Sequence, residues 1–107
     1  MSTDLSNTEK KQLRTIGHHL KPIITIAEKG VTENISAELI RALNDHELIK
    51  IKININDPQA RQQITEDLCK KHRAALVQSI GKVALILHRA KKTNEKLSNL
   101  KRPVANR

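Results

Sequence analysis

The sequence predicts an α+β domain in which helices mainly cover one face of a four-stranded mixed sheet, giving two layers in the order α-β-α-β-α-β-β. Three observations lead to this fold class. Apolar residues recur at helical spacing in three stretches, each close to a capping signal. Strand-like runs separate these helices, and strand-helix-strand units place their strands in parallel. Two final apolar runs are joined by Gly81-Lys82, which fits a tight antiparallel hairpin.

The first helix is expected to begin after Ser6, because Ser6 and Glu9 have the spacing of a capping box. Leu13 lies on its apolar face, and Gly17 is a suitable C-cap. The rest of the helix surface carries three cations, which serve either solvation or contact with a polyanion: Lys10, Lys11 and Arg14.

The middle of the chain alternates between strand and helix patterns. Residues 21–26 read as the first strand, and helical spacing predicts a second helix from about residue 33 to residue 44. Residues 49–55 have the clearest strand pattern, with four Ile on one face and Lys50, Lys52 and Asn54 on the other. Lys50 and Lys52 either add to a basic surface or simply meet solvent, as strand lysines usually do.

The last third contains a helix, a hairpin and a polar end. Asp57 and Pro58 are typical of a helix start, and this third helix should run to about His72. The two apolar runs of the hairpin follow, and beyond Ala90 the composition shifts to Lys, Asn and Ser. We therefore expect a domain at residues 1–90 and a basic flexible tail at residues 91–107.

Length and cysteine content limit the class of protein. A chain of 107 residues suits one domain that folds without cross-links. Cys69 is the only cysteine, so an internal disulfide is excluded and a reducing compartment is favoured. No apolar run approaches the length of a membrane span. We expect a cytoplasmic monomer with no membrane contact.

Charge is unevenly distributed. The formal net charge is +9, with 13 Lys and Arg against 10 Asp and Glu up to His88 and 7 against 1 from there to the end. Such a balance favours a polyanion such as nucleic acid as partner. There is no Phe, Tyr or Trp, which argues against modules that stack bases on aromatic rings. Contact should therefore run through phosphates, shape and hydrogen bonds.

The stretch from Ile26 to Glu33 is the main candidate site. A strand-to-helix turn leaves amide groups without internal partners at the positive end of the helix dipole, which favours an anion. Gly30 can adopt a positive φ, Lys29 supplies a charge and Thr32 is a good N-cap. Most such turns bind nothing, so the pattern by itself is weak.

Nothing in the sequence indicates catalysis, a metal or a cofactor. His18 and His19 are adjacent in a loop without further ligands at suitable spacing. Cys69 reads as a small, partly buried residue, and the Asp-His-Glu run at residues 45–47 has no nucleophile nearby in sequence. P-loop and GxSxG motifs are absent from the sequence. We therefore expect a protein that is not an enzyme.

Four sequence blocks occur in the order and spacing of one known family: Leu20-Lys21-Pro22, Gly30-x-Thr32-Glu33, His46 to Ile53 and Ile80-Gly81-Lys82. With these blocks, residues 6–90 resemble the CRM domain (chloroplast RNA splicing and ribosome maturation) in its stand-alone bacterial YhbY form. The resemblance implies a fold similar to the C-terminal domain of translation initiation factor three. It also implies RNA binding and an assembly role on rRNA of large ribosomal subunit precursors.

In that family the loop after the first strand usually reads G-x-x-G, similar to the KH-domain loop that clamps nucleic-acid backbone. Ala27 stands in place of the first glycine here, and Glu28 weakens the local positive charge. Alanine resists a positive φ by roughly 1 kcal/mol or more, so this loop can differ in shape from the G-x-x-G loop of the family. The resemblance implies RNA contacts from the loop and from neighbouring basic residues: Ala27, Glu28, Lys29, Gly30, Thr32, Lys10, Lys11, Arg14 and Lys21.

Three hypotheses of function remain, each from a different class. The leading one is an RNA-binding module for large-subunit maturation. The alternative is a protein-interaction adaptor in ribosome assembly whose basic charge is incidental, and the third is an enzyme acting on RNA. DNA binding stays open on charge alone.

Overall fold

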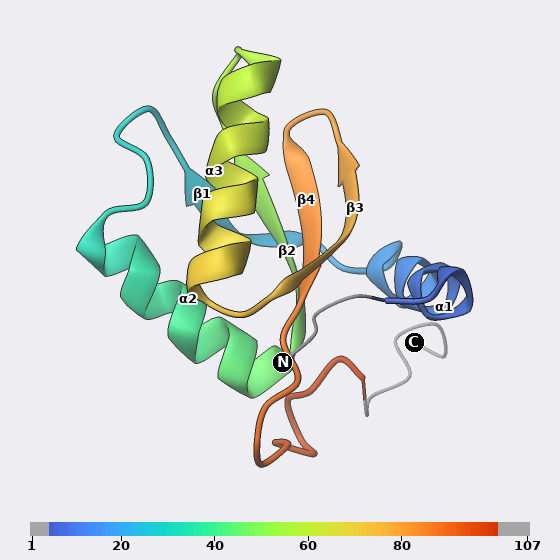
Figure 1. Ribbon diagram of the computed structural model, residues 1–107. Coiled ribbons are helices and arrows are strands. Elements are labelled where there is room, and N and C mark those ends of the chain that lie inside the picture. The colour runs from blue at the N-terminus through green and yellow to red at the C-terminus, as the bar shows by residue number, and fades with distance from the viewer. Residues whose placement is uncertain (1–4, 101–107) are drawn as a thin grey trace.

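The computed structural model describes residues 5–100, which fold as three helices and four strands (Figure 1). The elements in chain order are α1 (Asn7–Gly17), β1 (Pro22–Ile26), α2 (Glu33–His46), β2 (Leu48–Ile53), α3 (Pro58–Lys71), β3 (Ala75–Ile80) and β4 (Val83–Leu87). The predicted order of elements is confirmed.

The strands form one mixed sheet in the order β1-β2-β4-β3. Strands β1 and β2 are parallel and are linked through α2, whereas β4 is antiparallel to both of its neighbours. The hairpin between β3 and β4 has Gly81 at φ +57, a conformation that glycine adopts without strain. The four-stranded mixed sheet is confirmed.

Helices α2 and α3 cover the isoleucine face of the sheet. Ile49, Ile51 and Ile53 of β2 are buried there, together with Leu39 of α2 and Leu68 of α3. Full burial of one such side chain stabilises the fold by roughly 1.5–3 kcal/mol. Because the chain lacks aromatic residues, this core consists of aliphatic side chains and Cys69.

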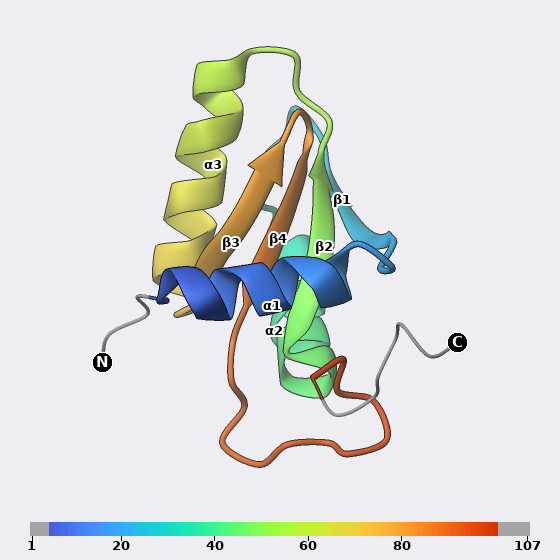
Figure 2. The same ribbon diagram turned by 90° about the vertical axis from the view of Figure 1, so that its right-hand side faces the viewer.

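Helix α1 lies on the opposite face of the sheet. Figure 2 shows α1 crossing in front of the strands, with α2 behind them and α3 at the left beside β3. Leu13 of α1 packs there in a second cluster with Leu48, Leu85 and Leu87. The predicted two-layer arrangement therefore gains a third, partial layer. The physical reason lies in β2, which begins with Leu48 and Ile49 and so supplies one apolar residue to each face.

Gly17 allows the close approach of α1 to the sheet. It is the last helical residue, and His18 takes the C-cap position in an ordinary right-handed conformation. A Cβ on Gly17 would overlap the Leu85 side chain. The predicted C-cap role of Gly17 is therefore wrong, and the glycine serves packing instead.

The chain after β4 returns to the junction between α2 and β2. We call residues 90–100 the C-terminal segment. Ser98 is fully buried, and Asn99 donates from Nδ2 to the Leu48 carbonyl at 2.7 Å. Leu100 packs on the cluster beneath α1. Packing thus continues past the boundary predicted at residue 90, because polar contacts without apolar periodicity hold this segment. Residues 101–107 of the predicted tail lie outside the described residues.

Candidate nucleic-acid interface

The loop between β1 and α2, residues 27–32, forms a tight and exposed turn. The Gly30 N–H donates to the Ala27 carbonyl at 2.8 Å. Gly30 has φ +75 and nothing lies within 4 Å of a Cβ placed on it, so glycine is needed for the backbone and not for space. Among described non-glycine residues only Glu47 and Arg73 have a positive φ. Ala27 therefore replaces the first loop glycine without left-handed strain.

Helix α2 begins where this loop ends. Thr32 is its N-cap, and Thr32 Oγ1 accepts a hydrogen bond from the Ile35 N–H at 3.3 Å. The predicted cap is therefore confirmed. Glu28 directly precedes Lys29, Glu33 begins α2, and both offset the charge of Lys29. An anion at this loop would be held chiefly by backbone amides and the helix dipole, with Lys29 as the one side-chain cation.

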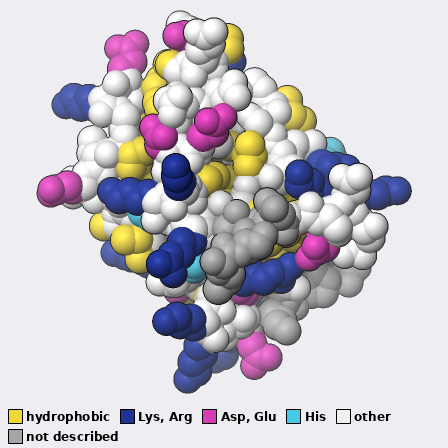
Figure 3. Space-filling view, in the orientation of Figure 1, with side chains coloured by type: hydrophobic (Ala, Val, Ile, Leu, Met, Phe, Trp, Pro, Cys, Tyr) yellow, Lys and Arg dark blue, Asp and Glu magenta, His cyan; other side chains and the backbone are white. Residues whose placement is uncertain are grey.

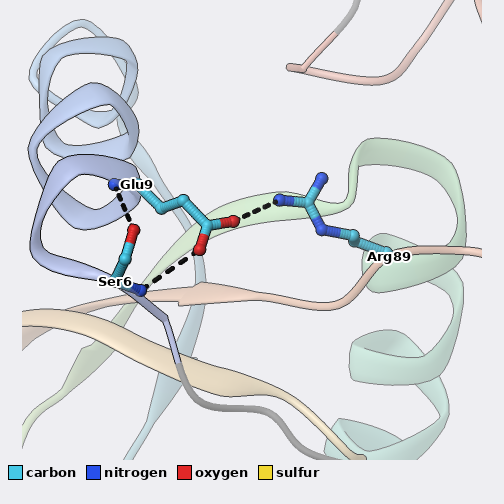
Figure 4. Close-up of polar contacts among 3 residues, drawn as sticks. All are labelled: Ser6, Glu9 and Arg89. Carbon is cyan, nitrogen blue, oxygen red and sulfur yellow. Dashed lines mark hydrogen bonds and ion pairs between the residues drawn. The ribbon is translucent and has the colours of Figure 1, made fainter.

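Helix α1 presents the second group of predicted contacts. Lys11 and Arg14 are exposed and Lys10 is partly buried. Figure 3 shows Lys and Arg side chains at the right of the view, where α1 lies in Figure 1. Ser6 and Glu9 form the predicted capping box, with both hydrogen bonds at 3.1 Å (Figure 4). The sequence thus determines where α1 begins.

Glu9 makes the single ion pair found among residues 5–100. Its Oε2 lies 3.5 Å from an amino nitrogen of Arg89, and both side chains are exposed (Figure 4). The Ser6 backbone N–H is the main cause that lowers the pKa of Glu9, and Arg89 contributes less. Exposed pairs of this kind add little stability. The cations of α1 therefore have no acidic partner within the described residues.

The nine predicted contact residues fall into two separate groups. Lys21 and Ala27 flank the two ends of β1, and the steps along the strand between them span about 20 Å. Lys21 adjoins α1, whereas the loop leads into α2 on the other face of the sheet. Figure 1 shows the loop and α1 on opposite sides of the molecule. No single small ligand could contact both groups, but a folded polymer could.

The structure also assigns a role to His46 and Glu47, which the sequence pattern left open. The Glu47 carboxylate is buried and accepts hydrogen bonds from the Ser98 hydroxyl at 2.7 Å and the Ala90 N–H at 2.8 Å. His46 Nδ1 lies 3.0 Å from the Leu97 carbonyl oxygen. These residues anchor the C-terminal segment. In the sequence, only the family motif from His46 to Ile53 pointed to these residues.

Cys69 and His72 are two further described side chains whose pKa values are shifted. Burial raises the pKa of the Cys69 thiol to about 11, which keeps it protonated. Burial is the main cause that lowers the pKa of His72, followed by Lys71 and His88. Within residues 5–100, no three His, Cys, Asp or Glu side chains gather into a metal site. In the same residues, each helix is too short or too polar to cross a bilayer.

A hollow of about 570 Å³ lies at the edge of the molecule, away from the loop. It lies between α3 and the edge strand β3, and the start of α1 reaches it. Both charged and apolar side chains line it, among them Lys10, Glu66, Lys70, Arg73 and Leu76. Lys10 is the sole predicted contact residue in its lining.

Residues 5–89 match the CRS1 / YhbY (CRM) domain. This chain belongs to the CRM domain family. The match runs from the residue before the capping box of α1 to just past the end of β4, and so includes both groups of predicted contacts. The C-terminal segment begins where the CRM domain ends.

Related proteins match this chain over most of its length. A protein of Pseudomonas aeruginosa named "Probable RNA-binding protein" is 50% identical over 98 residues, which are 92% of this chain and 94% of that protein. One of Haemophilus influenzae, named "RNA-binding protein", is 40% identical over 87 residues, or 81% of this chain and 87% of that protein. The solution structure of a hypothetical protein from Staphylococcus aureus has a TM-score of 0.74 at 30% identity, covering 88% of this chain and 97% of that one. The α+β fold is thereby confirmed.

Proposed function

We propose that this protein binds folded RNA through backbone phosphates, and that its target is rRNA in precursors of the large ribosomal subunit. The loop at residues 27–32 carries the proposal. It combines a left-handed Gly30, an exposed Lys29 and the capped start of α2 at one end of the sheet. CRM family membership and relatives named as RNA-binding proteins support the same ligand class.

Contact through phosphates follows from composition. The chain has no Phe, Tyr or Trp side chain for stacking on bases, and its net charge is +9. The cations of α1 supply positive charge on one side of the sheet, and the loop supplies backbone amides at the end of β1. The ligand would be held in place without any chemical step, cofactor or metal. We place this activity in the cytoplasm, on a monomer.

A competition assay tests the proposal. A transcribed fragment of large-subunit rRNA would be bound at moderate salt against unlabelled duplex DNA of the same length. We expect the rRNA fragment to be preferred, and log affinity to fall linearly with log salt as counterions are released. Equal competition by the duplex, or no binding at low ionic strength, would contradict the proposal.

A protein-interaction adaptor is the second candidate function. It is favoured by exposed apolar side chains, since Ile40 of α2 is 52% exposed and Ile80 of β3 is 66% exposed. If the protein is an adaptor, replacing Lys29 and Arg14 by Gln should leave its binding to large-subunit precursors unchanged. An RNA-binding protein should lose most of that association.

A further inference from the structure

Helix α1 covers only part of its face of the sheet. On this face Leu48 and Leu87 are paired and buried beneath α1. The next residues along β2 on the same face are Lys50, paired with Leu85, and Lys52, paired with Val83. Lys50 is partly exposed and Lys52 is exposed. Leu85 itself still packs beneath α1, so Lys50 lies at the border of the covered part and Lys52 lies beyond it. We call the face of β2 at Lys50 and Lys52 the open sheet face.

The open sheet face is positively charged because of the strands themselves. The sequences of the four strands contain two charged residues in all, Lys50 and Lys52, and neither Asp nor Glu. Both lysines project to this face, about 7 Å apart along β2. Lys82 follows in the hairpin, where its Nζ lies 3.4 Å from Asn54 Oδ1. A row of cations without a neighbouring strand carboxylate complements a polyanion.

These lysines lie between the two groups of predicted RNA contacts. Strand β2 runs parallel to β1, with Lys50 level with Pro22, just after Lys21, and Lys52 level with Thr25. At the far end the Asn54 N–H donates to the Ile26 carbonyl at 2.7 Å, at the point where the loop begins. The row of lysines therefore leads from the α1 side of the sheet to the loop.

We propose that the open sheet face is a third part of the RNA interface. Lys50 and Lys52 contact consecutive stretches of one RNA backbone, which passes from α1 across β2 to the loop at residues 27–32. The inference rests on the proposed function and extends it, because it explains how two groups of contacts about 20 Å apart serve one ligand. Charge complementarity and continuity with both groups identify RNA as the occupant.

The test is a matched pair of double variants assayed with the transcribed rRNA fragment. Lys50→Gln/Lys52→Gln removes two charges from the open sheet face. Lys70→Gln/Lys71→Gln removes two exposed charges from α3, which lies behind the sheet. If each strand lysine neutralises one phosphate, the slope of log affinity against log salt should fall by roughly 1.4 to 1.8 in the first variant. The α3 variant should change it by less than half as much.

Two further measurements keep the test decisive. Urea unfolding shows whether the Lys50→Gln/Lys52→Gln variant is folded. If that variant is unfolded, the single change Lys52→Thr at an exposed strand position takes its place in the assay. On the wild-type protein, acetylation of lysines with and without the rRNA fragment should show protection of Lys50 and Lys52 but not of Lys70. Equal acetylation of Lys50 and Lys52 with and without RNA, or an unchanged salt slope in the strand variant, would overturn the inference. The proposed function would still stand in that case, provided that the wild type binds the rRNA fragment. If the wild type does not bind the rRNA fragment, both the inference and the proposed function are overturned. If the open sheet face binds an acidic protein and not RNA, the inference is overturned.

Discussion

Glu47 connects three parts of this protein through its backbone and its carboxylate. It has φ +61, which is unfavourable for a side chain other than glycine, and its carboxylate is buried. The strain is offset because the carboxylate accepts two hydrogen bonds from the C-terminal segment, and because the Glu47 carbonyl accepts from the His88 N–H at 2.9 Å. One residue thus joins the end of α2, the end of β4 and the C-terminal segment.

Replacing Glu47 should therefore be costly. In Glu47→Ala the Ser98 hydroxyl and the Ala90 N–H lose a charged acceptor, so we expect a loss of about 2–4 kcal/mol in the free energy of unfolding. Glu38→Ala, at an exposed position of α2, is the control and should change it by less than about 0.5 kcal/mol. Urea unfolding followed by circular dichroism measures both. A loss for Glu47→Ala no larger than that of the control would show that the segment is not anchored there.

Cys69 gives a second prediction at the scale of one residue. Burial raises its pKa to about 11, so at pH 8 little thiolate is present. The folded protein should react with a thiol reagent such as iodoacetamide at least tenfold more slowly than the urea-unfolded chain, as measured by mass spectrometry over time. Equal rates for the two forms would mean that the side chain is accessible and ionised.

Helix α1 is the element in which local and distant signals are most clearly separate. Its start is local, because Ser6 and Glu9 cap each other over one turn. Its position is not local, because Gly17 and Leu13 fit against Leu85 and Leu48 of strands far along the chain. The amphipathic pattern of the helix therefore predicted that it packs on the sheet, but not on which face.

The capping box of α1 should make stability depend on pH in the acid range. The Ser6 N–H lowers the pKa of Glu9 in the folded protein below the ordinary value of 4.5. The contribution of Glu9 to stability is therefore present above pH 4.5 and is lost as the pH falls through the lower, folded pKa. The wild type should exceed Glu9→Gln in urea midpoint at pH 7, and the difference should shrink toward pH 3. A difference that is constant with pH would exclude this source.

At the scale of the whole molecule, charge is arranged around a sheet that separates the two groups of predicted contacts. The cations of α1 lie on one face, the loop at residues 27–32 opens at the far end of β1, and the strand lysines lie between them. The C-terminal segment is tied to the same body, so its lysines are fixed near α2 up to Leu100. Position, and not only net charge, should therefore decide which cations matter.

A comparison of two sites tests this statement. Lys29→Ala combined with Gly30→Asp removes a cation, adds an anion and disturbs the turn that Gly30 closes. It should weaken binding to the rRNA fragment about tenfold or more, whereas Lys96→Ala in the C-terminal segment should weaken it by about twofold. Filter binding at one fixed salt concentration measures both. Equal losses would indicate diffuse attraction spread over the chain.

Most elements of this protein were determined by the sequence itself. Capping residues, the Ile and Lys alternation of β2 and the Gly81 hairpin act over a few residues, so neighbours in the chain suffice to specify them. Those signals predicted the order of elements, the mixed sheet and the N-cap of α2. The family motifs likewise pointed to the CRM domain, and the likeness extends over residues 5–89.

Tertiary structure alone decided which face α1 covers, where the C-terminal segment packs and how the nine predicted contacts are distributed. Each depends on partners far apart in sequence, such as Gly17 with Leu85 or Glu47 with Ser98. Such pairs leave no periodic pattern, because hydrogen bonds and close approach require the complete sheet to bring the partners together. The sequence therefore supplied the residues of the candidate interface, and folding alone separated them into two groups with Lys50 and Lys52 between.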